Sequence, residues 1–193
     1  MMHYMIGDRR SAADLAVHNA KVLAGYGADA IVTPCTSCAV MLKEHYRDLV
    51  PDAKLPEVLS FSQLWERELD GKIAPSPRKE GAAALAFHEP CHLGVALHLK
   101  AQPRAMLGSL RGATYMKTAG EDACCGYGGA FNVEHYKASR RIGSKKKRAY
   151  EDRGVTIVAT ECAGCMLQLT DVLADCEGPI EVISTAEALD RYY

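Results

Sequence analysis

Short apolar runs alternate with longer stretches of helical periodicity along this chain. A helix is expected over about residues 10–25, where the apolar positions are Leu15, Val17, Val22 and Leu23, and another over about 132–153. A short buried strand is expected from Ala28 to Thr33, with further strands near 57–60, 83–87, 113–117, 155–160 and 180–183. Strands that alternate with helices predict an α/β fold with mainly parallel sheets flanked by helices.

The chain also repeats itself, which favours two related subdomains. Residues 30–42 (AIVTPCTSCAVML) correspond to residues 157–169 (IVATECAGCMLQL), and residues 56–60 (PEVLS) resemble residues 180–184 (IEVIS). We predict an incomplete first repeat at 1–71, a connector rich in proline and glycine at 72–81, and a complete second repeat at 82–193.

Five cysteines in the second repeat have the spacing of metal ligands. They are Cys91 in the sequence HEPCH, the adjacent Cys124 and Cys125 before Gly126, and the C-x-x-C pair Cys162 and Cys165. Thiolates are soft ligands that iron–sulfur clusters and zinc select. Predicted strands precede them, so a metal site is expected at the C-terminal ends of parallel strands. Inert buried thiols are the alternative, which explains one cysteine better than five in this arrangement.

This cysteine pattern resembles the CCG cysteine-rich domain of the heterodisulfide reductase catalytic subunit. Its relatives include iron–sulfur subunits of lactate, glycolate and anaerobic glycerol-3-phosphate dehydrogenases. The resemblance covers about residues 82–175 as a complete motif and residues 10–70 as the later half of another. It implies a four-iron four-sulfur cluster, cubane or non-cubane. The ligands that it implies are Cys91, Cys124, Cys125, Cys162 and Cys165.

The first repeat retains only part of this motif. Cys35 and Cys38 match Cys162 and Cys165, so they mark an incomplete second site. Full-length members of the family carry two motifs, and the repeat register places Met1 opposite Gly128. We therefore expect either an N-terminally truncated chain or another polypeptide that completes the first half.

Three functions are compatible with these residues. The leading one is an iron–sulfur oxidoreductase subunit that relays electrons for a partner dehydrogenase, such as a flavoprotein, or passes them to a thiol or disulfide substrate. The second is a zinc-binding structural or interaction module of a redox complex. The third makes the Cys35 and Cys38 pair a thioredoxin-like dithiol without metal, although its place in the repeat argues for a metal motif.

Composition limits the other classes of function. The net charge of −1 gives no electrostatic case for binding nucleic acid. No apolar stretch is long enough to span a bilayer directly, and the N-terminal residues lack the apolar core of a signal peptide. We expect a cytoplasmic protein, with any membrane association made through a partner.

Four other features receive predictions of their own. His92 is expected to donate a hydrogen bond to cluster sulfur rather than to serve as a substitute ligand. His88 is expected either to relay protons or to lie at the surface or in the core. The basic run at residues 145–148 is expected on a solvated helix face. Tyr127 is expected to shield the cluster from water, and Cys176 to pack as a small apolar residue.

Overall fold

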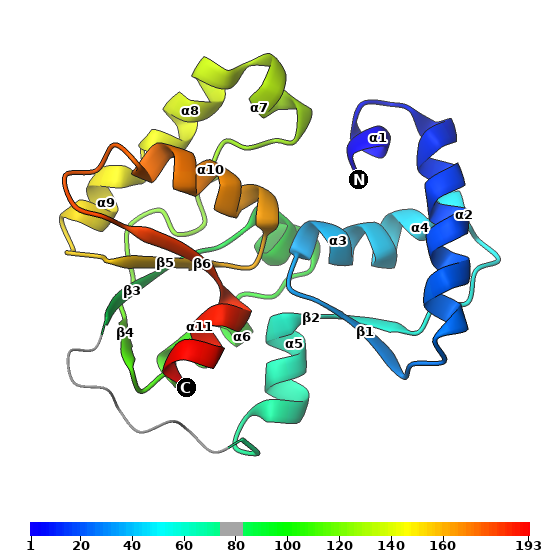
Figure 1. Cartoon of the computed structure of the whole chain (residues 1–193), viewed down its shortest axis with the longest axis horizontal. Coiled ribbons are helices and arrows are strands. Elements are labelled where there is room, and N and C mark those ends of the chain that lie inside the picture. Colours follow the sequence, from blue (N-terminus) through cyan, green and yellow to red (C-terminus); the bar gives the residue numbers. More distant parts are fainter. Residues whose placement is uncertain (74–82) are drawn as a thin grey trace.

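The structure is a computed structural model that describes residues 1–73 and 83–193 (Figure 1). The predicted connector at 72–81 therefore falls almost wholly outside the described residues. In chain order the elements are α1 (Met2–Met5), α2 (Arg9–Gly25), β1 (Ala30–Thr33), α3 (Thr36–Val40), the π-helical η1 (Met41–His45), α4 (Tyr46–Leu49), β2 (Glu57–Ser60), α5 (Phe61–Leu64), the π-helical η2 (Trp65–Leu69), β3 (Ala83–His88), the π-helical η3 (His92–Ala96), α6 (Ala101–Gly108), β4 (Ala113–Tyr115), α7 (Ala130–Glu134), α8 (Tyr136–Ser144), α9 (Lys147–Glu151), β5 (Ile157–Thr160), α10 (Ala163–Leu173), β6 (Glu181–Ser184) and α11 (Thr185–Tyr192).

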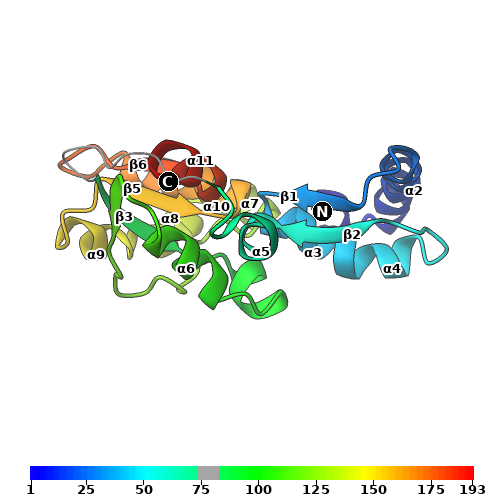
Figure 2. The same ribbon diagram turned by 90° about the horizontal axis from the view of Figure 1, so that it is seen from below.

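Two parallel sheets confirm the predicted α/β class. The smaller sheet pairs β1 with β2, and the larger has the strand order β4-β3-β5-β6. Figure 2 shows the two sheets following one another along the length of the molecule. Every strand expected from the sequence is present, because each apolar run is short and is bounded by turn residues or by the start of a helix.

The internal repeat predicted from the sequence has a structural counterpart. Ala30 of β1 lies opposite Glu57 of β2, and Ile157 of β5 lies opposite Glu181 of β6, so the two strand pairs have the same register. Both second strands end in a serine that caps the next helix: Ser60 Oγ accepts from the Gln63 N–H, as Ser184 Oγ does from the Glu187 N–H.

An ion pair also repeats between the halves. In the first half, Arg67 forms an ion pair with Glu57 at 2.8 Å. In the second half, Arg191 forms an ion pair with Glu181 at 2.9 Å. Residues 1–73 thus follow the pattern of residues 128–193, while β3 and β4 have no counterpart among the described residues of the first half.

Alternate residues of the larger sheet supply two separate cores. On one face, Leu85 and Phe87 of β3 pack with Met106 of α6 and Leu189 of α11. On the other, the apolar cluster contains Ala86, Val158, Tyr150, Leu169 and Val172, together with Cys125, Cys162 and Cys165. Three of the candidate metal ligands therefore belong to this second core, where Cys162 is the N-cap of α10 and Cys165 lies within that helix.

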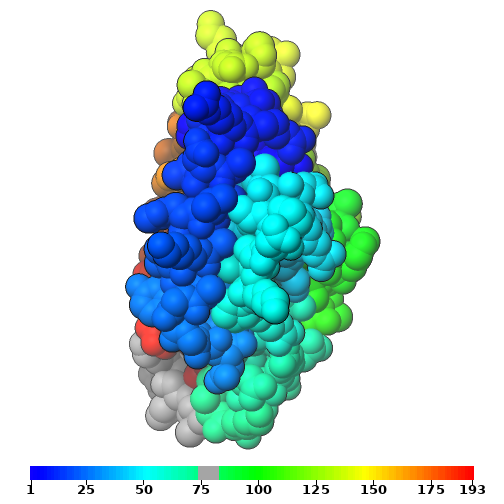
Figure 3. Space-filling model, turned by 90° about the vertical axis from the view of Figure 1, so that its right-hand side faces the viewer, coloured from blue at the N-terminus to red at the C-terminus, as the bar shows by residue number. Residues whose placement is uncertain are grey.

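Contacts across the halves hold the two sheets together. Trp65 of η2 is 3% exposed and packs into the core of the larger sheet. The Thr36 N–H donates to the Glu161 carbonyl at 2.8 Å, and the buried Glu161 carboxylate accepts hydrogen bonds from Ser62. At the other end of the interface, the N-terminal segment lies against the segment that begins near residue 130, as Figure 3 shows in blue and yellow-green.

Two local predictions differ from the structure, while the helix predicted over about 10–25 is present as α2. Helix 132–153 is divided into α7, α8 and α9, because the backbone leaves the helical region at His135 (φ −127°, ψ 45°). In α2 the buried residues are Ala12, Ala16 and Ala20, while the larger Val17 faces solvent. Strand β1 is only partly buried, since it pairs with β2 alone in the described residues, whereas β5 pairs on both edges and is buried throughout.

Within the described residues, no helix combines the length and the apolar character that crossing a membrane requires.

Candidate metal centre

The cysteines predicted from the sequence gather at the carboxyl ends of β1, β3 and β5. His88 closes β3 and lies opposite Thr160, which closes β5, so the two strands end at the same level. Cys91 follows β3 by three residues, and Cys162 follows β5 by two. Because parallel strands point the same way, these turns meet at one edge of the sheet.

Three of the five predicted ligands are buried. Cys125, Cys162 and Cys165 are 4%, 5% and 6% exposed. Cys162 is the extended N-cap of α10 (φ −153°, ψ 119°), and Cys165 lies one turn further on. The sulfur of Cys165 is 3.3 Å from that of Cys125, which comes from a different loop. Soft donors from two distant segments thus converge in a space closed to solvent.

The other two predicted ligands, Cys91 and Cys124, are exposed. The Gly126 N–H donates to the Cys124 sulfur at 3.3 Å. A hydrogen bond with Cys125 and burial raise the pKa of Cys124, and the nearby Cys91 thiol adds to this increase. Cys124 therefore lies beside Cys125 on the open side of the site, and Cys91 lies near enough to act on the pKa of Cys124.

The first-half cysteines reach the same place. Cys35 is the N-cap residue of α3, as Cys162 is the N-cap residue of α10. Hydrogen bonds with Cys162 and Cys38 lower the pKa of Cys35, although burial opposes the change. We call Cys38, Cys35, Cys162, Cys165, Cys125 and Cys124 the thiol row, in the order in which they neighbour one another. The sequence alone did not reveal this continuity, since the Cys35–Cys162 contact forms between the halves.

Ser37 and His92 support the middle of the thiol row. The Ser37 hydroxyl is 3.3 Å from the Cys162 sulfur and 3.0 Å from Nδ1 of His92. Burial lowers the pKa of His92. His92 therefore reaches the sulfur of Cys162 through Ser37, whereas the sequence suggested direct hydrogen bonding to a bound cluster.

Hydrogen bonds between neighbouring thiols change the pKa values along the thiol row. Hydrogen bonds with Cys124 and Cys165 lower the pKa of Cys125. The same bond between Cys125 and Cys165 raises the pKa of Cys165. A thiolate at Cys125 is thus stabilised by thiols on both sides. A metal ion that binds thiolates displaces such protons, so metal binding here is coupled to proton release.

A polar network positions the loop that carries Cys124 and Cys125. The Ser139 hydroxyl of α8 donates to the Gly126 carbonyl at 2.8 Å, and the Gln168 amide of α10 donates to the Ser139 carbonyl at 3.0 Å. Gly126 has φ +90°, and a Cβ there would meet the Ser139 carbonyl. Only glycine allows the loop to lie this close to α8 in this conformation.

A second network holds the Cys91 turn beside the same loop. Arg104 donates to Glu89 at 2.7 Å and to Glu121 at 3.1 Å, and both carboxylates are nearly fully buried. The Glu89 N–H also donates to the Glu121 carbonyl at 2.9 Å. Gly94 leaves the space that the Glu89 carboxylate fills. One guanidinium therefore ties together the turns that precede Cys91 and Cys124.

Tyr127 covers the C-x-x-C turn. Its ring lies over Gly164, where a Cβ would be 2.7 Å from the ring carbon Cδ1. The glycine between Cys162 and Cys165 is thus required by the packing of Tyr127, whose role in shielding a cluster stays a prediction.

The structure corrects the interpretation of the basic run at Lys146, although Lys145 and Arg148 are exposed as expected, and it supports the interpretation of Cys176. Lys146 is buried and donates to the Gly120 carbonyl, so it does not belong to a solvated face. Burial lowers its pKa, while the thiols of Cys125 and Cys165 act in the opposite direction.

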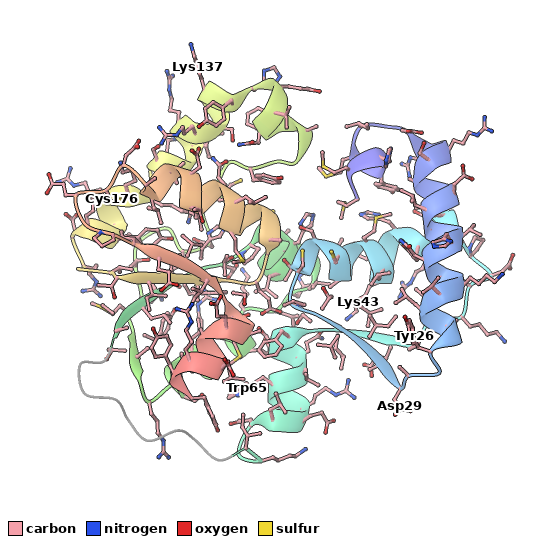
Figure 4. All side chains as sticks on the ribbon, viewed as in Figure 1. Tyr26, Asp29, Lys43, Trp65, Lys137 and Cys176 are labelled. Atoms are coloured by element: carbon pink, nitrogen blue, oxygen red, sulfur yellow. The ribbon has the colours of Figure 1, made fainter. Side chains whose placement is uncertain are left out.

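Cys176 packs beside the apolar cluster beyond α10, at the end of the molecule away from α3 (Figure 4).

His88 is the residue whose place in the site the sequence did not predict. Its imidazole is buried, and one ring nitrogen and the sulfurs of Cys125 and Cys165 all lie within 4.8 Å of one another. The available sequence signal was its position as the last residue of a predicted strand, three residues before Cys91.

A family model described as "CCG: Cysteine-rich domain" matches residues 1–43 and 85–170. The matched segments include all the cysteines of the thiol row and Cys91.

Curated relatives include a subunit of the fumarate reductase (CoM/CoB) of Methanothermobacter marburgensis, which is 29% identical over 93% of this chain and 35% of the relative. The "Probable glycolate oxidase iron-sulfur subunit" of Bacillus subtilis is 26% identical over 87% of this chain and 39% of its own length. "Lactate utilization protein A" of Lysinibacillus sphaericus is 26% identical over 84% of this chain and 74% of its own length. The chain thus spans little more than a third of the first two relatives.

Proposed function

Because this chain belongs to the CCG family of cysteine-rich domains, we propose that it is an iron–sulfur subunit of an oxidoreductase. One observation carries the proposal: the buried sulfurs of Cys125, Cys162 and Cys165 converge at one sheet edge, with Cys91 and Cys124 on the solvent side. Relatives that are named as a fumarate reductase subunit and an iron–sulfur subunit of glycolate oxidase support the same class of function.

The donor set fits an iron–sulfur cluster. All five donors are thiols, and tetrahedral zinc needs only four ligands. Adjacent cysteines such as Cys124 and Cys125 can bind two different metal atoms of one cluster. We assign Cys91, Cys124, Cys125, Cys162 and Cys165 as the residues that would hold a four-iron four-sulfur cluster, which would supply one-electron transfer.

Electron exchange would take place on the side of Cys91 and Cys124. Both are exposed, so a partner protein could approach the centre from there, while Tyr127 and α10 cover the other side. We propose a partner dehydrogenase subunit as the electron donor, with a small thiol or disulfide substrate as the alternative reactant at this side. A flavoprotein is the partner that suits two-electron oxidation of a hydroxy acid.

Zinc is the second candidate, and one observation favours it. His88, Cys125 and Cys165 offer three ligand atoms within 4.8 Å of one another, and Cys162 neighbours Cys165 in the thiol row. A nitrogen and three sulfurs suit a closed tetrahedral zinc site. The chain would then be a structural or interaction module of a redox complex.

We further propose that residues 1–71 form an incomplete first repeat. Cys35 and Cys38 hold the places that Cys162 and Cys165 hold in the second repeat, and β1 pairs with β2 alone in the described residues where β5 also pairs with β3. Completing a second metal site would require thiolates from another segment or polypeptide.

Metal and sulfide analysis of anaerobically purified protein tests the proposed function. We expect iron, acid-labile sulfide and a broad visible absorption that bleaches on reduction. Colourless protein with stoichiometric zinc would replace the first function with the second. Protein that binds neither metal after reconstitution would contradict both.

A further inference from the structure

His88 lies where a ligand of the metal centre would lie. It is the last residue of β3, level with Thr160 of the neighbouring strand, and its side chain is 1% exposed. One of its ring nitrogens and the sulfurs of Cys125 and Cys165 are mutually within 4.8 Å. Ligand atoms bound tetrahedrally to one metal at about 2.0 to 2.3 Å are about 3.3 to 3.8 Å apart. The sulfurs of Cys125 and Cys165 are already 3.3 Å apart.

The nitrogen atoms of this imidazole are enclosed by protein. Within the described part of the chain, neither ring nitrogen makes a well-formed hydrogen bond, although the ring is enclosed. Burying a polar ring without partners is unfavourable, so such groups in native proteins usually have a functional explanation. A bond from one nitrogen to a metal would provide it.

The surroundings also suit the second ring nitrogen. Burial has the largest effect on the pKa of His88 and lowers it. The Cys125 thiol and the backbone of Glu121 lie close enough to raise this pKa in part. The Glu121 carbonyl is held in place by the Glu89 N–H at 2.9 Å. Histidine ligands of metals characteristically donate their free N–H to a backbone carbonyl or carboxylate, which fixes the ring.

We propose that His88 is a nitrogen ligand of the metal centre, bound beside Cys125 and Cys165. This inference rests on the proposed function, because it requires that a metal centre forms at the thiol row. It replaces an all-thiolate centre with a mixed nitrogen and sulfur one. Neutral imidazole donates less negative charge than thiolate, so such a centre is reduced at a higher potential.

His92, the other histidine beside the Cys91 turn, provides a matched control. It is half-buried and lies next to Cys91 in sequence, but its Nδ1 is occupied by the Ser37 hydroxyl at 3.0 Å. A variant with His92→Ala removes an imidazole of the same neighbourhood without removing the proposed ligand.

Pulsed EPR of the iron-loaded full chain, labelled with nitrogen-15 histidine and poised in its paramagnetic state, tests the proposal. We expect the hyperfine coupling of a directly bound nitrogen in the wild type and in His92→Ala. The coupling should disappear in His88→Ala and in His88→Cys. The cysteine variant retains a soft ligand, so it keeps iron bound should the alanine variant lose it.

Each result decides the question. Iron-loaded wild type without a bound-nitrogen coupling, or a coupling that persists in the His88 variants, overturns the His88 assignment and leaves the proposed function standing. Wild-type protein that binds zinc in place of iron contradicts the iron–sulfur function, and the His88 assignment is then overturned if His88→Ala retains as much zinc as His92→Ala. Protein that binds neither metal contradicts the proposed function and with it this inference. Iron content and circular dichroism of every sample distinguish these cases from misfolding.

Discussion

At the scale of single residues, sulfur atoms from separate loops meet because the backbone around them is tightly constrained. Cys162 and Cys165 share the first turn of α10, and Cys125 is brought to them by a loop that only Gly126 permits. Substituting one inner thiol removes a soft donor, while its neighbours remain in place.

We predict that Cys162→Ser or Cys165→Ser lowers metal content by more than half and reduces thermal stability, because ligands from distant segments couple metal binding to folding. Cys176→Ser is the matched control, since Cys176 packs outside the thiol row. Metal per chain and melting temperature would be measured for all three. Wild-type metal content in both ligand variants would refute the ligand set.

A second residue-scale prediction concerns Arg104. Replacing it with methionine leaves the buried carboxylates of Glu89 and Glu121 unpaired, and losing one partner of such a pair costs about 3 kcal/mol. Denaturant unfolding of the metal-free chain measures the loss. Arg67→Met breaks an exposed ion pair with Glu57 and should cost much less, because solvent screens exposed charges. Equal losses in the two variants would contradict the role of the buried network.

At the scale of secondary-structure elements, much of the molecule follows from the sequence. The strands are predictable because short apolar runs end in turn residues, and the repeat fixes which strands correspond. The division of helix 132–153, which begins where the backbone leaves the helical region at His135, is marked by no proline in the sequence. The inward turn of Lys146 to the Gly120 carbonyl was not predictable either, because the residue types suggest a continuous basic surface. Only tertiary contacts reveal that choice.

The turn between the Cys124–Cys125 pair and α7 gives an element-scale prediction. Gly126→Val should weaken metal binding or shift the reduction potential, because its Cβ would meet the Ser139 carbonyl of α8. Gly154→Val is the control: it has a similar positive φ of +60°, but open space around it. The backbone conformation costs both variants about 1–3 kcal/mol. A metal centre that is unchanged in Gly126→Val would show that the loop does not pack on it.

At the scale of the whole molecule, the two halves meet through their first helical turns. The sequence predicted that Cys35 and Cys38 repeat the Cys162 and Cys165 pair, and hence that both pairs follow strands. It could not predict that Cys35 neighbours Cys162, because that contact depends on how the halves pack. Thr36, Trp65 and Glu161 create this packing, and none of them carries a sequence signal for it.

This arrangement predicts one metal centre per chain. Cys35 and Cys38 supply only two thiolates of their own, too few for tetrahedral zinc or a four-iron cluster. In the loaded protein, Cys35 and Cys38 should both remain free to react with thiol reagents. Metal per chain and mass in solution would be measured together. Two full centres in a monomer would contradict the prediction, whereas two in an oligomer would point to ligands shared between chains.

The most direct test of the central claim is an anomalous difference map, collected at the iron absorption edge from crystals of anaerobically purified protein. We predict iron peaks within bonding distance of the sulfurs of Cys125, Cys162 and Cys165. Crystals that show free thiols at these three residues, or a single zinc peak among them, would contradict the assignment of an iron–sulfur centre.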